Sequence, residues 1–232
     1  MKNRLNNRQL YLIVALTLGV VGIAILGVMI GHKAPQVVVD IPPITHWYDS
    51  VEWKSETVDG DFIVREFDTP NKGKGKNMVN GVVLHHTACA TTEDAFKVLT
   101  SPRGGVSCHV LIDYDGTRYV LAPPDTITWH AGKSRLNGKD GANDFTVGIE
   151  FQGNTLETPL TDEQIESAID YLLPIIEKYK IPLNNIVTHE YIRNEYKQHY
   201  PKKKNVWPKV DVTPTEYDRF MKALKNRLGE TN

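Results

Sequence analysis

The sequence predicts an α/β domain preceded by one N-terminal membrane-spanning helix. From residue 80 onward, segments with strand character alternate with segments with helix character, and the longest helical segment carries a complete start signal. An uncharged apolar run over residues 10–30 predicts the membrane helix. The chain has 232 residues and 41% of them are hydrophobic, so the part after this run is long enough for one domain with its own core.

The run over residues 10–30 reaches the ~20 apolar residues that a helix needs to cross a bilayer. Residues 1–9 contain basic side chains and no acid, so the positive-inside rule keeps them in the cytoplasm and exports the rest of the chain. A cleaved signal peptide is the alternative. Signal peptides have an apolar region of only ~7–15 residues followed by a small-x-small cleavage site, and no convincing site of this kind follows the run. We therefore expect a signal anchor, a linker over residues 31–67 and a domain over residues 68–228 outside the cytoplasm. The Gly/Lys-rich segment 70–77 is predicted to be a solvated connector at the start of this domain.

The composition excludes several classes of protein. The net charge is −1 and the pI is about 6.7, so no overall basic character points to nucleic acid. The cysteines, Cys89 and Cys108, are too few for a disulfide scaffold or a four-thiolate zinc site. In an exported domain they could form one disulfide, and two free thiols are the alternative.

Five segments of the chain are predicted strands. GVVLHH (81–86) and CHVLID (108–113) are short and rich in β-branched or apolar residues, and a turn after the second leads into RYVLA (118–122), which predicts a hairpin. DFIVREFD (61–68) is a candidate strand that leads into the domain. FTVGIEF (145–151) alternates regularly between apolar and other residues.

This last strand places one carboxylate opposite an apolar face. Phe145, Val147, Ile149 and Phe151 share one side of the strand, and Glu150 lies on the other. The ordinary interpretation is a glutamate on the solvated face of a sheet. Beside a metal, the same carboxylate becomes a candidate proton shuttle, because burial disfavours its charged form.

Two helices are predicted after the last of these strands. The segment 161–180 begins with a capping box of Thr161 and Gln164 and continues with a core-facing apolar stripe. A final helix starts at Thr213, with proline at its first position and Glu216 completing a second capping box. Both apolar stripes are assigned to the core.

Three sites in the chain place histidine after an apolar run. These are His85 or His86 after VVL, His130 in ITWHAG and His189 after IVT. A lone histidine in such a place is most often a hydrogen-bonded structural residue, but the ends of neighbouring strands converge on one rim of a sheet. A catalytic zinc site uses three protein ligands and leaves the fourth position for water. His85, His189 and one further Asp, Cys or His would complete such a site.

The ordered segments GVVLHHTA, VSCHVLIDYDGTRYVLAPPDTITWHAG, NDFTVGIEFQGN and NNIVTHE resemble the landmarks of a known family. This is the family of zinc-dependent N-acetylmuramoyl-L-alanine amidases of the second type, which includes phage lysozyme-type amidases and peptidoglycan recognition proteins. The resemblance covers about residues 68–225. It implies a mixed central β-sheet flanked by helices, with a zinc (Zn²⁺) cleft at one rim and peptidoglycan as the partner.

The resemblance also implies the metal ligands. His85, the first histidine of its pair, matches the first ligand, and His189 matches the second. The third family ligand is a cysteine or aspartate that follows a lysine or threonine by two positions. The Lys209-x-Asp211 sequence fits this pattern, so Asp211 is the predicted third ligand and Lys209 its catalytic companion. The segment after His189 is longer than in the family, which leaves His199 as the competing third ligand.

The remaining roles follow from the same resemblance. Glu150 matches the acid of a catalytic glutamate branch and would take a proton from the attacking water, while Lys209 would hold the oxyanion. The bond cleaved is the amide between N-acetylmuramic acid and L-alanine of the stem peptide. His109 and His130 match positions that line the cleft, where each would contact substrate or have a structural role.

Two other functions fit the same residues. Recognition proteins of this kind that bind peptidoglycan without cutting it typically lack part of the metal set. A phage lysis enzyme with a releasable signal anchor is the other alternative, because glycines make the apolar run over 10–30 less hydrophobic than a leucine-rich one.

Overall fold

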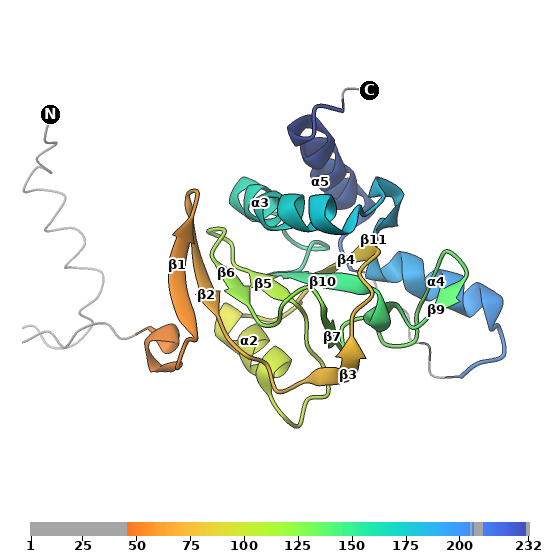
Figure 1. Ribbon diagram of the computed structural model, residues 1–232, viewed down its shortest axis with the longest axis horizontal. Helices are drawn as coiled ribbons and strands as arrows, with labels where there is room; N and C mark the ends of the chain where they lie inside the picture. The colour runs from red at the N-terminus through yellow and green to blue at the C-terminus, as the bar shows by residue number, and fades with distance from the viewer. Residues whose placement is uncertain (1–45, 205, 207–210, 231–232) are drawn as a thin grey trace, which may run out of the picture. The chain divides into compact units, whose positions relative to one another are not determined.

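A seven-stranded mixed β-sheet lies at the centre of the computed structural model, which describes residues 46–204, 206 and 211–230 (Figure 1). In sheet order the strands are β1 (Ser55–Asp59), β2 (Phe62–Glu66), β6 (Arg118–Val120), β5 (Val110–Ile112), β10 (Thr146–Phe151), β4 (Gly81–His86) and β11 (Ile186–Thr188). β10 is parallel to both β5 and β4, and β11 is parallel to β4. The β5–β6 pair is the expected antiparallel hairpin. The predicted mixed sheet is confirmed.

Helices cover both faces of this sheet. They are α2 (Thr92–Thr100), α3 (Asp162–Tyr179), α4 (His189–His199) and α5 (Pro214–Arg227), with short 3-10 helices η1 (Trp47–Ser50), η2 (Ala142–Asp144) and η3 (Leu183–Asn185). α3 and α5 lie on one side of the sheet and α2 on the other (Figure 1). None of the helices in the described residues combines the length and hydrophobicity of a membrane span.

The start of α3 agrees with its sequence signal, whereas the start of α5 agrees only in part. The Thr161 hydroxyl accepts the Gln164 N–H at 3.0 Å, and the Gln164 side chain accepts the Thr161 N–H at 3.1 Å, which completes the capping box. α5 begins at Pro214 as expected, but the predicted box with Glu216 is wrong. The buried Glu216 carboxylate instead accepts the N–H of Leu160 at 2.9 Å, so it satisfies a different backbone donor.

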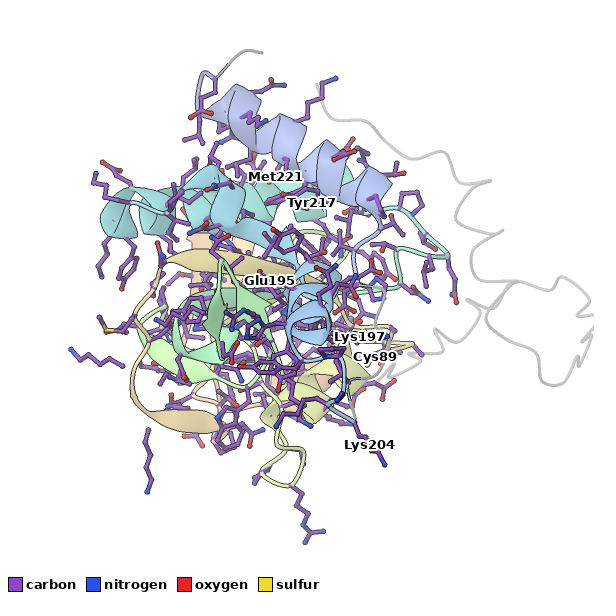
Figure 2. The ribbon with its side chains drawn as sticks, turned by 90° about the vertical axis from the view of Figure 1, so that its right-hand side faces the viewer. Cys89, Glu195, Lys197, Lys204, Tyr217 and Met221 are labelled. Atoms are coloured by element: carbon purple, nitrogen blue, oxygen red, sulfur yellow. The ribbon has the colours of Figure 1, made fainter. Side chains whose placement is uncertain are left out.

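The larger core lies between the sheet and the pair α3–α5. Apolar residues of β4 and β10 alternate onto this face, and Met221 of α5 packs there with Tyr217 at its margin (Figure 2). The contributing strand residues are Val82, Leu84, Val147, Ile149 and Phe151. Phe145 departs from its expected face, because β10 begins only at Thr146 and Phe145 packs with Val83 and Val187 on the opposite side.

A second core lies between α2 and the β5–β6 hairpin, and we call it the aromatic core because several aromatic rings meet there. Phe96 of α2 and Tyr119 of β6 are buried there, and Trp47 and Trp53 pack against both rings. Full burial of a side chain such as Phe96 stabilises a fold by roughly 1.5–3 kcal/mol, and the partly buried Trp47 and Trp53 add to the packing that holds the N-terminal segment on the domain.

Two segments that were expected to be irregular are ordered. The linker predicted over residues 31–67 is wrong for the part the structure describes, because β1 is an edge strand of the central sheet and β2 pairs with β1 on one side and β6 on the other. The candidate strand predicted at 61–68 is confirmed as β2. The connector predicted at 70–77 contains a strand, β3 (Lys72–Lys76), which pairs with β7 (Thr126–Thr128). Glycine permits this pairing, since a Cβ on Gly73 would lie 2.5 Å from the Ile127 side chain.

Two further strands, β8 (Arg135–Leu136) and β9 (Lys139–Asp140), form a small hairpin. The predicted cytoplasmic segment 1–9, the predicted membrane helix 10–30 and the linker up to residue 45 lie outside the described residues.

Candidate active site

The parallel strands β10, β4 and β11 deliver the site. Glu150 pairs with His85 across β10 and β4, and Thr188 pairs with Leu84 across β11 and β4. His189 follows Thr188 directly, as the first residue of α4. Because neighbouring parallel strands end at the same edge of a sheet, these residues meet at one rim.

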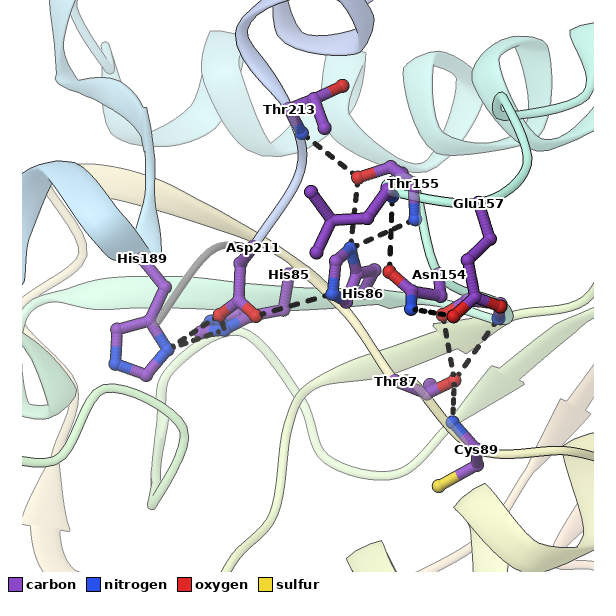
Figure 3. A network of polar contacts seen from close by, with 12 residues as sticks. His85, His86, Thr87, Cys89, Asn154, Thr155, Glu157, His189, Asp211 and Thr213 are labelled. Atoms are coloured by element: carbon purple, nitrogen blue, oxygen red, sulfur yellow. Dashed lines mark hydrogen bonds and ion pairs between the residues drawn. The ribbon is translucent and has the colours of Figure 1, made fainter. Parts of the chain in front are cut away.

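Three of the predicted site residues converge as a compact group. Nδ1 of His85 lies 3.1 Å from Nδ1 of His189 and 3.3 Å from Oδ2 of Asp211. The distance between Nδ1 of His189 and Oδ2 of Asp211 is 2.9 Å. All three residues are buried. Asp211 reaches them from the segment that leads into α5, far along the chain (Figure 3).

The chemistry of these atoms fits a divalent metal. Two imidazole nitrogens and a carboxylate oxygen lie in mutual contact, and a single proton can bridge only one pair of them. A cation between them satisfies all three, and within the described part of the chain they form a group able to hold a metal ion. Two histidines and one carboxylate match the three-ligand sets that leave a fourth position open.

The second histidine of the pair, His86, supports Asp211 from its other side (Figure 3). Its Nδ1 accepts the backbone N–H of Thr155 at 3.1 Å, so its proton is on Nε2, which lies 3.9 Å from Oδ1 of Asp211. The Thr155 hydroxyl oxygen accepts the N–H of Thr213 at 2.9 Å. These contacts tie the loop after β10 to the segment that carries Asp211, where Val212 has a strained φ of 29°. The sequence analysis missed this role, although the histidine doublet was its signal.

Glu150 is buried, so its assignment to a solvated sheet face is wrong. Its exposed fraction is 9%, and every residue of β10 is buried. The carboxylate lines a cavity of about 230 Å³ together with His130, Trp129 and residues of α2 such as Leu99. We call His85, His189 and Asp211 together the metal group. In-register pairing with His85 places Glu150 on the same face of the sheet as this metal group.

His130 and His109 occupy different environments. His130 lines the cavity, and its Nδ1 lies 3.0 Å from Nε2 of His85. Burial, followed by the neighbouring imidazoles, holds the pKa of His130 well below its ordinary value, so its ring is neutral.

His109 is inaccessible to a substrate. It is fully buried, its Nδ1 accepts the Gly148 N–H at 2.9 Å and its Nε2 donates to the Thr126 carbonyl at the same distance. Burial lowers the pKa of His109 to about 4, which keeps the ring neutral. The predicted substrate contact is therefore wrong for His109, because its nitrogens hold β10 and β7 together.

The cysteines are both free thiols. Cys108 is buried in the aromatic core, whereas Cys89 is partly exposed and lines the cavity. Burial raises the pKa of both thiols, more strongly for Cys108. The disulfide alternative is not realised in this structure.

His199 is separated from the metal group. It lies exposed at the C-terminal end of α4 and contacts the ring of Tyr200. The geometry therefore favours Asp211 as the third ligand. Lys209 lies outside the described residues, so its role remains a prediction.

Comparison with known proteins identifies the family. The model of the N-acetylmuramoyl-L-alanine amidase family Amidase_2 matches residues 75–204, which include the strands and two histidines of the site. The chain belongs to this amidase family. Asp211 lies beyond the matched range, so its assignment rests on the geometry described above.

Several characterised amidases resemble the chain over part of their length. The 1,6-anhydro-N-acetylmuramyl-L-alanine amidase AmpD of Enterobacter cloacae is 38% identical over 92 residues, which are 40% of this chain and 49% of that protein. The amidase AmiD of Escherichia coli K12 is 29% identical over 123 residues, 47% of this chain and 44% of AmiD. The chain thus spans about half the length of the curated relatives it matches.

Several solved structures share the fold. A crystal structure of an AmpD derivative superposes with a TM-score of 0.53 at 23% identity, covering 69% of this chain and 93% of that one. The E90A mutant of PlyL gives a TM-score of 0.50 at 16% identity, covering 70% and 98%. At these identities the comparison concerns the fold alone.

The geometry predicts which residue completes the metal group of this amidase-family chain. Asp211→Ala should weaken zinc binding more than the ~10–100-fold that typically follows loss of an outer-shell partner, because a direct ligand is removed. His199→Ala, the control, should bind zinc as the parent chain does. Competition with a chromophoric chelator measures both affinities, and the reverse order would move the third ligand into α4.

Proposed function

We propose that the protein is a zinc-dependent N-acetylmuramoyl-L-alanine amidase that acts on peptidoglycan or its fragments. It would hydrolyse the amide between N-acetylmuramic acid and the L-alanine of the stem peptide. The observation that carries this proposal is the convergence of His85, His189 and Asp211 beside a cavity lined by the buried carboxylate Glu150. Family membership supports the same reaction.

The three ligands would hold zinc through Nδ1 of His85, Nδ1 of His189 and the carboxylate of Asp211. Zinc, when bound, would polarise the scissile carbonyl and lower the pKa of a water molecule toward ~7. A buried site strengthens these electrostatic effects. The complete donor set favours catalysis over the alternative of a binding module, which does not require all three ligands.

Glu150 would act as the general base and then as the general acid. From its place in β10 it faces the cavity, where it would take a proton from the attacking water and deliver it to the leaving amine of L-alanine. Lys209 would stabilise the oxyanion of the tetrahedral intermediate.

The cavity suggests how the substrate would lie. Its walls include the apolar side chains of Val98 and Leu99 from α2 and the partly exposed indole of Trp129, with Glu150 and His130 at the polar end. Such a site fits a ligand with an apolar or sugar face next to the amide that is cut. The relative AmpD is named a 1,6-anhydro-N-acetylmuramyl-L-alanine amidase, so anhydro-muropeptides are a candidate substrate beside intact sacculi.

The activity is tested by digesting purified sacculi and anhydro-muropeptides with the protein and identifying the products by mass spectrometry. We expect free stem peptides with L-alanine at the N-terminus, about one bound zinc per chain, and loss of activity on chelation. His85→Ala and His189→Ala should lose both zinc and turnover, since each removes a ligand. Cleavage at another bond, or full turnover with a strong chelator present, contradicts the proposal.

The location of the activity is a separate proposal. The apolar run over residues 10–30 and the basic residues before it would anchor the chain with its domain outside the cytoplasm. Protease added to spheroplasts should then degrade the domain while leaving a cytoplasmic marker intact. Release of the protein from the membrane during lysis would instead favour the phage lysis enzyme.

The role of Glu150 can be separated from metal binding. Glu150→Gln should retain zinc and the fold, because the amide is nearly isosteric, but lose ~10²–10⁴-fold in turnover with the proton shuttle removed. Glu157→Gln, at an exposed position in the following loop, is the matched control and should keep parental turnover. If kcat is unchanged in Glu150→Gln, the general base must be another group.

A further inference from the structure

His130 connects the metal ligand His85 to the strand β10. Its Nδ1 lies 3.0 Å from Nε2 of His85, and its Nε2 lies 3.3 Å from the hydroxyl oxygen of Thr146. The three side chains therefore form a continuous chain of polar contacts, and all three are buried.

The direction of each hydrogen bond in this series of contacts follows from the Thr146 hydroxyl. The Thr146 hydroxyl donates its only proton to the carbonyl of Ala142, at 2.6 Å. Its oxygen can therefore only accept from His130, so the proton of the neutral His130 ring is on Nε2. Nδ1 of His130 is then a lone pair that accepts the Nε2–H of His85. This leaves a lone pair on Nδ1 of His85, the atom that faces His189 and Asp211.

The ring of His130 is fixed by its surroundings. The Asn143 side-chain oxygen accepts the backbone N–H of His130 at 3.1 Å and that of Ala131 at 2.7 Å. The ring packs directly on Gly148 of β10, where an added Cβ would lie 2.5 Å from Cγ of His130. Glycine at this position allows an approach that another residue would prevent.

We propose that His130 is a positioning residue that sets the tautomer and ring orientation of His85 for metal binding. Outer-shell partners of metal-bound histidines act in this way in general, by holding the proton on the nitrogen that does not bind the metal. The inference rests on the metal site of the proposed function but is independent of the substrate. Of the two roles expected for His130, substrate contact and a structural role, it specifies the second.

Two substitutions at one position test the proposal. His130→Phe keeps an aromatic ring but removes the acceptor, and zinc affinity should fall ~10–100-fold, as is typical for an outer-shell partner. His130→Asn places a side-chain oxygen where Nδ1 was, so it should restore most of that affinity. Chelator competition gives the zinc dissociation constants, and circular dichroism verifies the fold.

A second variant guards against misfolding of His130→Phe. Thr146→Val removes the hydroxyl oxygen that accepts the hydrogen bond from His130, without changing the lining of the cavity. This variant should also weaken zinc binding. Trp129→Phe is the control, because Trp129 lines the cavity but takes no part in the contacts that join His85, His130 and Thr146. The zinc affinity of this variant should equal that of the parent protein.

Nitrogen-15 NMR of histidine in the zinc-free protein gives a readout that does not depend on zinc or turnover. We expect His85 to be protonated at Nε2 in the parent chain and to lose this preference in Thr146→Val and His130→Phe. Parental zinc affinity in both variants with an increased KM in His130→Phe would overturn the proposal, as would a parent His85 protonated at Nδ1. A protein that binds zinc with the expected tautomer but cleaves no muropeptide would refute the proposed function alone.

Discussion

The in-register parallel pairing of β10, β4 and β11 is the constraint on which the site depends. It aligns Glu150 with His85 and brings His189 beside them, since each residue lies at the same end of its strand. A one-residue slip of β4 would exchange the faces of His85 and His86 and remove the metal group. The apolar face of the same strands, packed under α3 and α5, opposes that slip because it would move Val82 and Leu84 out of the larger core. The core thus sets the register, and the register positions the chemistry.

The opposite face of these strands carries several polar side chains that are still buried. Such an arrangement is stable only when the polar groups have partners, and the histidines largely supply one another and the backbone. His109 joins β10 to β7 through both ring nitrogens, while His130 joins His85 to Thr146. Small residues make room for this network, since Gly148 accommodates the ring of His130. In many antiparallel sheets the corresponding face is exposed to solvent, whereas here the face with His85 and Glu150 lines the candidate active site.

Asp211 depends on a different set of contacts. It comes from a segment outside the sheet and reaches the metal group because α5 packs on the larger core and His86, through Thr155, holds the residues just before that helix. One carboxylate oxygen faces the ligands and the other faces His86. The two histidines of the doublet therefore act on opposite faces of β4 and meet at the same carboxylate. This division explains why both are needed next to each other.

Local patterns in the sequence were sufficient to predict the α/β class, the α3 capping box, the β5–β6 hairpin and the histidines at strand ends, because these depend on nearest neighbours and on period. The mixed sheet was predicted from the resemblance to a known family. The ordered segment from Trp47 to Asp59 was not predicted, since the packing partners of its tryptophans lie on α2 and β6. Tertiary structure also decided what each polar residue does: Glu150 is buried, His109 is structural and Glu216 serves Leu160 instead of its own helix. The physical reason is that burial and hydrogen-bond partners are properties of the assembled chain, whereas propensity and alternation are written residue by residue.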